Sequence, residues 1–518
     1  MTDWARHLQT VNKKQSPNQN DMVNFSEYDE YGRQSRNYLG YTDNSANGYY
    51  KNNVQTSQAD FYKNALKTAH TNFPWADVEF DGSPFNMIEK MGAPGATWQI
   101  DENYSEMGYR LNTTTDHIRK WEIGANGTNC LSQSEYNANE LICNHGTDEN
   151  VKTTTIFKDM EGKIIAVEST KNNQKYYSYY IYDVFDRPVF FIPPKAVQMM
   201  KDLQTWNTSS LQEELVYRFE WDKRGRLVKM HTPGKDVVEY IYDNLDRLIM
   251  IQNGNQRSEG LWSFVKYDKL GRKIITGIFD DSSLPSSYGC GGYTMQEMYD
   301  YWISNGPTQN FERISENSPL SYHGYSNLAF PLLTATDECY QIYYYDNYDF
   351  TPSGFRNEYQ DVGGFTNEQA DRIYGKLTGV KIKVLDNTET WLYSAFFYDD
   401  RGRTIQTYSN NQFYNGYDEF TFQYDFNGKL LKSRQVQTAL IDGAPHMYNI
   451  NKRYVYDHAG RLLTEFQSFN DQPEVMIKQL QYNELGQIVD KSLHSTDQGA
   501  RSYNPLTINT IFGDGLLI

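Results

Sequence analysis

A hexapeptide of the form aromatic-Asp-x-x-Gly-Arg recurs ten times along the chain, and this recurrence limits the possible folds more than any other feature. Within a cluster, neighbouring copies begin 21 to 39 residues apart, a spacing typical of repeat architectures. The stronger copies are YDEYGR at 28–33, YDVFDR at 182–187, WDKRGR at 221–226, YDNLDR at 242–247, YDKLGR at 267–272, YDDRGR at 398–403, YDFNGK at 424–429 and YDHAGR at 456–461, and the weaker ones are KDMEGK at 158–163 and YNELGQ at 482–487.

The residues around one copy predict a β-hairpin. In 237–254, Val238 and Tyr240 alternate with other residues before the hexapeptide, and Leu248 and Met250 resume the alternation after it. Two such runs joined by a short loop are typical of a hairpin. The chain is therefore predicted to be all-β, with a spiralling antiparallel sheet of hairpins and a few short helices.

Each defined position of the hexapeptide has a role in such a turn. The second position is Asp in nine copies and Asn483 in the tenth, and this side chain can accept backbone N–H bonds. The fifth is Gly in eight copies, with Asp186 and Asp246 in the others, as expected where φ is positive. The sixth is Arg in seven copies and Lys in two, and it lies across the turn from the Asp, where a charged pair is natural. Ten similar sets of these residues indicate a structural role, because an active site needs only one set.

Motifs with a known mechanism are absent from the sequence. There is no Gly-rich phosphate loop, no GxSxG elbow, no HExxH pair and no EF-hand loop. His145, near Asp148, and His323 are isolated loop histidines with no visible nucleophile or metal partner. We therefore predict no catalytic, cofactor-binding or metal-binding residues, no cofactor, and no enzyme activity.

Composition narrows the class of partner. The net charge of −17 argues against nucleic acid, which requires clustered Lys and Arg. Cys130 and Cys143 flank a polar loop and could pair, whereas Cys290 and Cys339 are far apart, and no cysteine spacing suggests zinc. The sequence contains neither a signal-peptide core nor an apolar run of membrane-spanning length, so the chain expressed as given is expected in the cytoplasm.

The repeats divide the chain into six parts. Residues 1–50 are read as the start of the array, 51–150 as a cap-like region with a short helix at 56–70, and 151–280 as array. An irregular insert follows at 281–370, with GCGGY at 289–293 and YYYD at 343–346, which lacks the Gly-Arg half of the hexapeptide. The array resumes over 371–498 and ends in an atypical tail, 499–518. Further helices are predicted at 193–203 and 294–304.

The hexapeptide is the YD repeat, and the chain resembles bacterial Rhs/YD-repeat proteins over most of its length. Residues 72–99 also look like the cap region that precedes the array in one branch of such proteins. The resemblance implies a hollow shell, in a parent that is exported or at the cell surface and carries a C-terminal domain, often a toxin, inside the shell. That domain and the remaining repeats are the partners it implies.

Both ends depart from the family pattern. Residues 6–17 resemble the returning strand of a hairpin whose first half is missing, and the family's core terminus and self-cleavage residues have no counterparts. The tail after Gly499 lacks strand alternation, and we expect a frameshift or assembly break there, which the nucleotide sequence would test. The chain is thus expected to be a non-catalytic shell fragment.

Two other functions remain open. Abundant Trp and Tyr suit a surface adhesion or carbohydrate-binding module, in which rings stack on sugars. A glycoside-active enzyme would need two carboxylates facing each other across a cleft, which sequence spacing cannot show.

Overall fold

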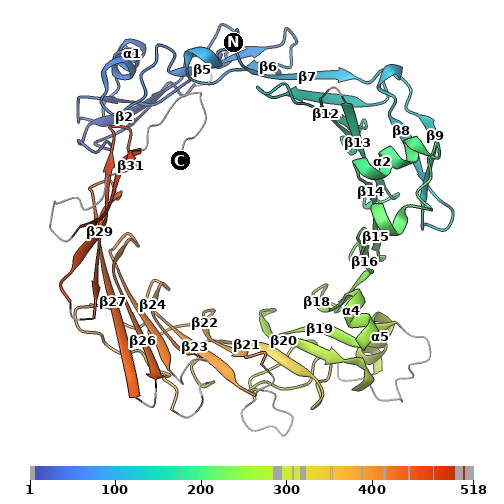
Figure 1. Cartoon of the computed structure of the whole chain (residues 1–518), viewed down its shortest axis with the longest axis vertical. Helices are drawn as coiled ribbons and strands as arrows, with labels where there is room; N and C mark the ends of the chain where they lie inside the picture. The colour runs from blue at the N-terminus through green and yellow to red at the C-terminus, as the bar shows by residue number, and fades with distance from the viewer. Residues whose placement is uncertain are drawn as a thin grey trace.

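The strands form one long antiparallel sheet that curves into a ring around a wide central opening (Figure 1). The computed structural model describes residues 6–172, 174–283, 294–305, 309–315, 323–350, 352, 354–386, 389–411, 416–441, 444–470, 472–495, 506 and 507. The predicted all-β class with a few short helices is confirmed. Within these residues, no helix is long and apolar enough to cross a membrane.

The main sheet is built almost entirely from strands that are neighbours in sequence. In ladder order its strands are β3 (Arg36–Tyr38), β5 (Trp75–Phe80), β6 (Ile88–Met91), β7 (Ser105–Leu111), β10 (Ile142–Thr147), β11 (Thr153–Lys158), β12 (Ile164–Lys171), β13 (Gln174–Tyr182), β14 (Pro188–Ile192), β15 (Tyr217–Trp221), β16 (Leu227–His231), β17 (Val238–Tyr242), β18 (Leu248–Gln252), β19 (Leu261–Tyr267), β20 (Lys273–Asp280), β21 (Glu338–Tyr345), β22 (Leu377–Lys383), β23 (Trp391–Tyr398), β24 (Thr404–Asn410), β25 (Tyr417–Tyr424), β26 (Leu430–Ile441), β27 (Ala444–Tyr456), β28 (Leu462–Phe469), β29 (Val475–Tyr482), β30 (Ile488–Ser495) and β31 (Leu506–Thr507). In the described part of the chain, no ladder joins β3 to β30 or β31, so the sheet is open.

Smaller elements surround this sheet. One small sheet has the order β1 (Gln9–Asn12), β2 (Asp21–Phe25) and β4 (Tyr41–Asp43), and another pairs β8 (Arg119–Ile123) with β9 (Cys130–Glu135). The helices are α1 (Val54–Asn64), α2 (Pro194–Asp202), α3 (Gln212–Leu215), α4 (Gly254–Glu259) and α5 (Met295–Asn305), with short 3-10 turns at Ala96–Trp98, Thr114–Asp116 and Asp281–Ser283.

Two of the three predicted helices are confirmed and one is misplaced. Those predicted at 193–203 and 294–304 are α2 and α5, and Thr294 caps α5 through Glu297. The helix predicted at 56–70 is α1, which begins earlier and ends at Asn64. Ala65 is extended and Leu66 is exposed, so the helix does not continue to residue 70. Residues 72–99, which resemble a cap region in sequence, supply β5 and β6 of the main sheet.

The hexapeptides make the predicted turn. In 242–247, Asp243 Oδ1 accepts the N–H groups of Leu245 at 2.9 Å and Arg247 at 2.8 Å, and Arg247 Nε donates to Asp243 Oδ2 at 2.7 Å. The fifth residue has positive φ in every copy, including Asp186 at 63° and Asp246 at 62°. Nine copies join adjacent strands of the main sheet, whereas the copy at 28–33 joins β2 to β3, which lie in different sheets.

The hexapeptide also binds one hairpin to the next, which the sequence did not predict. The Arg247 guanidinium lies 4.6 Å from the centre of the Tyr267 ring, and the Tyr267 hydroxyl donates to the carbonyl of Leu248 at 2.7 Å. The same bond to the preceding hairpin is made by the hydroxyls of Tyr182, Tyr345, Tyr398, Tyr424, Tyr456 and Tyr482. The first and sixth positions therefore fix the spacing of neighbouring hairpins.

Some turns are completed by residues far apart in sequence. The Asp346 N–H donates to the carbonyl of Lys376 at 3.1 Å, and the Gly375 N–H donates to Asp346 Oδ1 at 2.6 Å. The structure thus supplies the Gly-basic half that YYYD at 343–346 lacks in sequence. Asn112 and Leu141 close a second split turn, with the Leu141 N–H donating to Asn112 Oδ1 at 2.7 Å.

We expect Gly271→Val to lower the free energy of unfolding by about 1 to 3 kcal/mol, because a β-branched residue is strained at positive φ. Gly271 has φ 77°, and an added Cβ would meet nothing closer than Arg247 at 3.8 Å, so the cost comes from the backbone. Gly271→Asp is the matched control, since Asp186 and Asp246 hold the same position. Urea unfolding of the two variants checks this; equal stability of the Val variant and the parent would contradict the turn assignment.

Candidate functional site

The two faces of the sheet differ in what covers them. On β13 and β14, Tyr179, Ile181, Phe190 and Ile192 pack in one buried cluster with α2. Figure 1 shows α2 and α5 outside the ring. Since successive side chains of a strand point to opposite faces, the residues that alternate with this cluster face the central opening.

An aromatic row crosses the inner face over β13, β14 and β15. Tyr180 pairs with Phe191 and Phe191 pairs with Tyr217 in the ladders. Their ring centres are 4.9 Å and 5.6 Å apart, within the range of aromatic contacts. All three side chains are only partly buried. This part of the inner wall therefore offers a continuous neutral aromatic surface.

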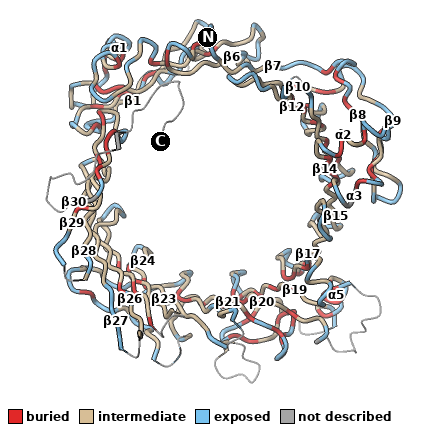
Figure 2. The backbone as a smooth tube through the Cα atoms, in the orientation of Figure 1, coloured by how far each residue is buried: buried red, intermediate tan, exposed pale blue. Residues whose placement is uncertain are grey.

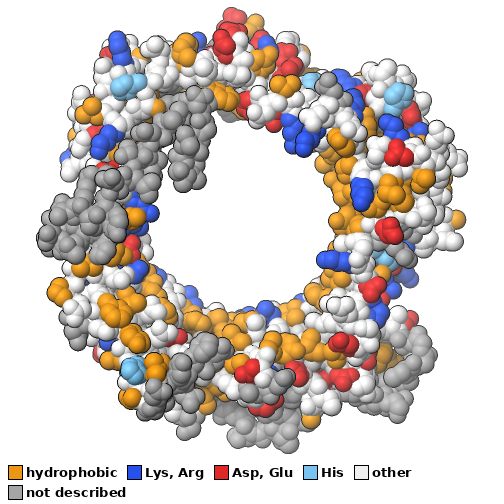
Figure 3. Space-filling model, in the orientation of Figure 1, with side chains coloured by type: hydrophobic (Ala, Val, Ile, Leu, Met, Phe, Trp, Pro, Cys, Tyr) orange, Lys and Arg blue, Asp and Glu red, His pale blue; other side chains and the backbone are white. Residues whose placement is uncertain are grey.

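The inner face also carries aromatic side chains farther along the ring. On β23 the buried Phe397 belongs to an outer cluster with Ala395, so Phe396 faces inward. The ladder then pairs Phe396 with Thr407 and Thr407 with Phe420. Figure 3 shows hydrophobic side chains along the lower and right edges of the opening, with single Lys and Arg side chains between them.

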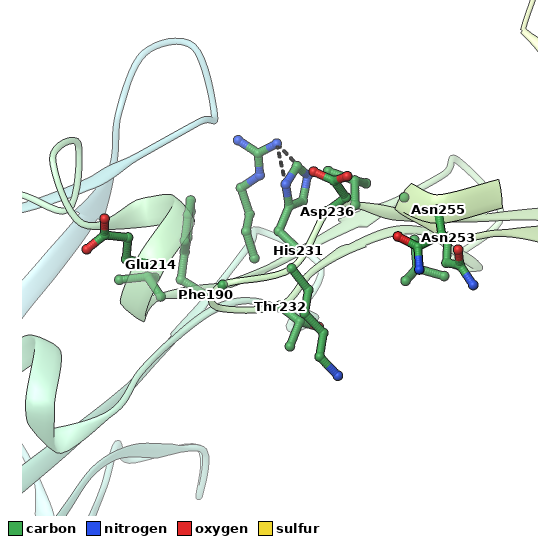
Figure 4. Close-up of a pocket in the computed structure, with 14 residues that line it drawn as sticks. Phe190, Glu214, His231, Thr232, Asp236, Asn253 and Asn255 are labelled. Carbon is green, nitrogen blue, oxygen red and sulfur yellow. Dashed lines mark hydrogen bonds between the residues drawn. The ribbon is translucent and has the colours of Figure 1, made fainter. Parts of the chain in front are cut away.

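An outer groove opens where the ring is one layer thick. Neither β15 nor β16 contains a buried residue, and Figure 2 shows no buried backbone there. The groove has a volume of about 1030 Å³. It is lined by Phe190, Glu214, Val216, Arg218, His231, Thr232, Gly234, Lys235, Asp236, Val237, Val238, Asn253, Gly254 and Asn255 (Figure 4).

The groove wall carries a small charge network. Arg218 donates to Glu220 at 2.7 Å, and His231 Nε2 lies 2.9 Å from Glu220 Oε1. The hydrogen bond with His231 holds the pKa of Glu220 below its usual value, against the effect of burial and with further help from the Arg218 charge. The groove also contains the carboxylates of Glu214 and Asp236, on opposite sides in Figure 4.

The residues singled out in the sequence lie in separate places. Cys130 and Cys143 are free, buried thiols in the cluster beneath α2, so the possible pairing does not occur. Burial raises the pKa of Cys130 to about 12 and that of Cys143 to about 11. His145 packs its ring against Gly108. Cys290, with GCGGY, lies outside the described residues, as does the tail 499–518 apart from β31.

His323 lies on the outer side of β22, far in sequence from His145. Its Nδ1 is 3.0 Å from Lys381 Nζ, and its ring centre is 4.9 Å from that of Trp391. Burial lowers the pKa of His323 to about 4, with a further contribution from the charges of Lys381 and Lys383. In the part of the chain that the structure describes, no group of three His, Cys, Asp or Glu side chains could hold a metal ion.

The ends of the described sheet are joined by a seam of side-chain contacts. The N-terminal block, residues 6–70 with β1, β2, β4 and α1, sits against the last two hexapeptide turns. Arg461 donates to the carbonyl of Gln15 at 2.7 Å, and Glu484 accepts from Asn18. Leu485 packs against the apolar cluster of the block, which contains Val23, Phe25, Tyr41 and Tyr62. Among the residues that the structure describes, side-chain contacts rather than a backbone ladder close the ring.

The start of the block resembles the second strand of a hairpin in its contacts. The Tyr28 hydroxyl donates to the carbonyl of His7 at 2.9 Å, and Arg6 lies 5.4 Å from the Tyr28 ring centre. These are the contacts that Leu248 and Arg247 make with Tyr267. The strand itself, β1, pairs with β2, which follows it in sequence.

Comparison with known proteins adds a family match and a shared fold. Residues 3–111 match the family described as a domain of unknown function, DUF6443. The fold is similar to that in the crystal structures of TcdB2-TccC3-Cdc42 and of TcdB2-TccC3 without its hypervariable C-terminal region, at a TM-score of 0.51 and 12% identity in each. The similarity covers 94% of this chain and 19% of each of those, so the chain spans about a fifth of their length. No curated protein is significantly similar to the chain.

Proposed function

We propose that the chain is a non-catalytic wall segment of a hollow shell, of the kind found in Rhs-type polymorphic toxins and effectors. In this proposal the shell encloses or presents a further polypeptide domain, and the parent protein is exported or displayed at the cell surface. The observation that carries the proposal is the inner wall, where Tyr180, Phe191 and Tyr217 form a continuous aromatic surface facing the opening.

The chemistry of this wall suits an enclosed polypeptide. Partly exposed rings offer large apolar contact areas, and tyrosine hydroxyls add hydrogen bonds that do not depend on one sequence. The charged residues that recur most regularly in the chain are the Asp and Arg of the hexapeptides. These side chains already form hydrogen bonds within the turns and between neighbouring hairpins. The wall can therefore hold a chain without a specific site for one ligand.

The fold shared with TcdB2-TccC3 supports a role in a toxin shell. This chain corresponds to about a fifth of those chains, and one of the two structures was described without its hypervariable C-terminal region. A variable segment attached to a constant ring of this kind is what the proposal requires of the parent protein.

Site-specific cross-linking tests enclosure. We would fuse an unstructured passenger polypeptide after residue 518 and place a photo-cross-linking amino acid at Tyr217 on the inner wall or at Phe185 on an exposed turn. We expect passenger cross-links from position 217 and few from position 185, because only the first faces the opening. Equal yields from both positions, in variants with unchanged circular dichroism, would refute enclosure by this ring.

A further inference from the structure

The turns of the hexapeptides form one rim of the ring, here called the turn rim, and it carries a row of exposed apolar side chains. They occupy the third or fourth position of the hexapeptide, at the tip of the turn. Phe185 is 73% exposed, Leu270 73% and Phe426 79%, and Leu245 is also exposed. Because each lies on a separate hairpin, the rim presents apolar tips at the spacing of the hairpins.

One tip in the same chain is covered, and it shows what such a tip binds. Leu485 holds the fourth position of the hexapeptide at 482–487 and packs into the apolar cluster of the N-terminal block. Beside it, Glu484 accepts hydrogen bonds from the amides of Asn18 and Asn20. Arg461 and His458 donate to the carbonyls of the same block loop.

This contact has a fixed polarity. The loop that meets the tips, residues 13–20, joins β1 to β2 at the end opposite to the 28–33 turn. The turn rim of the last hairpins therefore sits on the opposite rim of the first strands. We call the rim formed by the other loops the loop rim.

The outer groove lies on the loop rim. Its residues 232–237 connect β16 to β17, and 253–255 follow β18, whereas the hexapeptide turns of these strands are at 222–226 and 243–247. The lining of the groove combines the apolar residues Phe190, Val216 and Val238 with the asparagines Asn253 and Asn255. An apolar recess beside asparagine amides is also what receives Leu485 and Glu484 in the seam.

We propose that copies of this chain associate head to tail, with the turn rim of one copy seated on the loop rim of the next and an apolar tip in the outer groove. The partner is a second copy because one chain carries both halves of the contact, and because the seam already joins a turn rim to a loop rim in this polarity. The contact is heterologous, so it leaves a free turn rim and a free groove at the ends of each stack.

The charges around both surfaces are compatible with this contact. The groove edge has Lys235 and Arg218 together with Asp236 and Glu214. The tips are likewise flanked by both signs, with Lys269 beside Leu270 and Asp246 beside Leu245. Neither surface carries charges of only one sign, so neither would repel a second copy electrostatically.

Sedimentation velocity across protein concentrations tests the proposal. We expect the parent chain to self-associate between about 1 µM and 100 µM, the affinity range of modest interfaces. A tip variant, Phe185→Ser with Leu270→Ser, should weaken association at least tenfold. A groove variant, Val237→Arg with Asn255→Arg, should do the same by filling the groove. Tyr109→Ser is the control, since Tyr109 is 49% exposed but lies within β7, away from both rims.

Mixing the variants gives the decisive result. The tip variant keeps an intact groove and the groove variant keeps intact tips, so an equimolar mixture should form a 1:1 complex and nothing larger. A parent chain that stays monomeric throughout the concentration range would overturn the proposal, as would association that both variants leave unchanged. Either result leaves enclosure of a polypeptide by a single ring unaffected, because cross-linking from Tyr217 measures that separately.

Discussion

Lys266→Met is expected to lower the free energy of unfolding by about 3 to 5 kcal/mol, because it leaves a buried carboxylate without its partner. The side chains of Lys266 and Glu312 are both fully buried, and Lys266 Nζ lies 2.7 Å from Glu312 Oε1. Lys266 also donates to Asn327 at 2.8 Å and to the Ala329 carbonyl at 3.0 Å. The pair anchors the residues around Glu312 and Ala329 to β19, so the loss should be visible in urea unfolding.

Two further variants identify the cause. Lys266→Met with Glu312→Gln should recover part of the loss, because a neutral side chain at 312 needs no cation and can still accept the N–H of Ala329. Lys90→Met breaks an ion pair with Glu79 in which both side chains are partly exposed, and should change stability by less than about 1 kcal/mol. If Lys266→Met were as mild as Lys90→Met, the buried pair would not anchor these residues.

Asp21→Asn is expected to destabilise the N-terminal block by about 3 to 5 kcal/mol, because buried Lys51 would lose its nearest carboxylate and keep only that of Asp43, 3.8 Å away. Asp21 is fully buried and accepts from Lys51 Nζ at 2.8 Å, from the Gly48 N–H at 2.7 Å and from the Lys14 N–H at 3.0 Å. Hydrogen exchange of β1 and β2 should accelerate, while β13 and β14 keep their protection. Asp43→Asn is the control, since Asp43 is partly exposed and 3.8 Å from Lys51.

The same carboxylate gives the block a defined acid sensitivity. Burial alone would raise the pKa of Asp21, but the bonds from Lys51, Lys14 and Gly48 lower it to about 2. Between this value and the ordinary pKa near 3.8, the unfolded block binds more protons than the folded one, so stability falls as pH falls. The protection factors of β1 and β2, which correct for the intrinsic pH dependence of amide exchange, should therefore fall from pH 4 towards pH 2 in the parent, and the Asp21→Asn variant should show a smaller fall.

The sequence predicted local structure well where one short segment contains all the residues of a feature. The roles of Asp243, Arg247 and the positive-φ position at Asp246 follow from turn chemistry alone, and the structure confirms them. The prediction of helix α2 was also correct, because the apolar spacing and the proline that indicate it lie within one short segment. Such features depend on interactions within a few residues.

Features that join distant segments could not be predicted in this way. Asp346 and Gly375 form one turn, but 28 residues separate them in sequence, and no local pattern links them. The turn at 148–152 was missed because Thr147 and Val151 replace the expected aromatic residue and glycine. Strand alternation predicted that the sheet has two different faces. Both faces carry aromatic side chains, so the residue types alone do not identify the inner face. Only the packing of α2 and α5 shows which face meets the opening.

The split turns suggest how such walls diversify. The bonds at Asp346 and Asn112 hold the flanking strands in register whatever lies between their two halves, since the excursions leave and return at hydrogen-bonded neighbours. New sequence inserted at a hexapeptide turn would thus change the outside of the molecule without shifting any ladder. For protein engineering, these positions are ready-made grafting sites, where a reporter or recognition loop could be installed while the curvature of the wall stays the same.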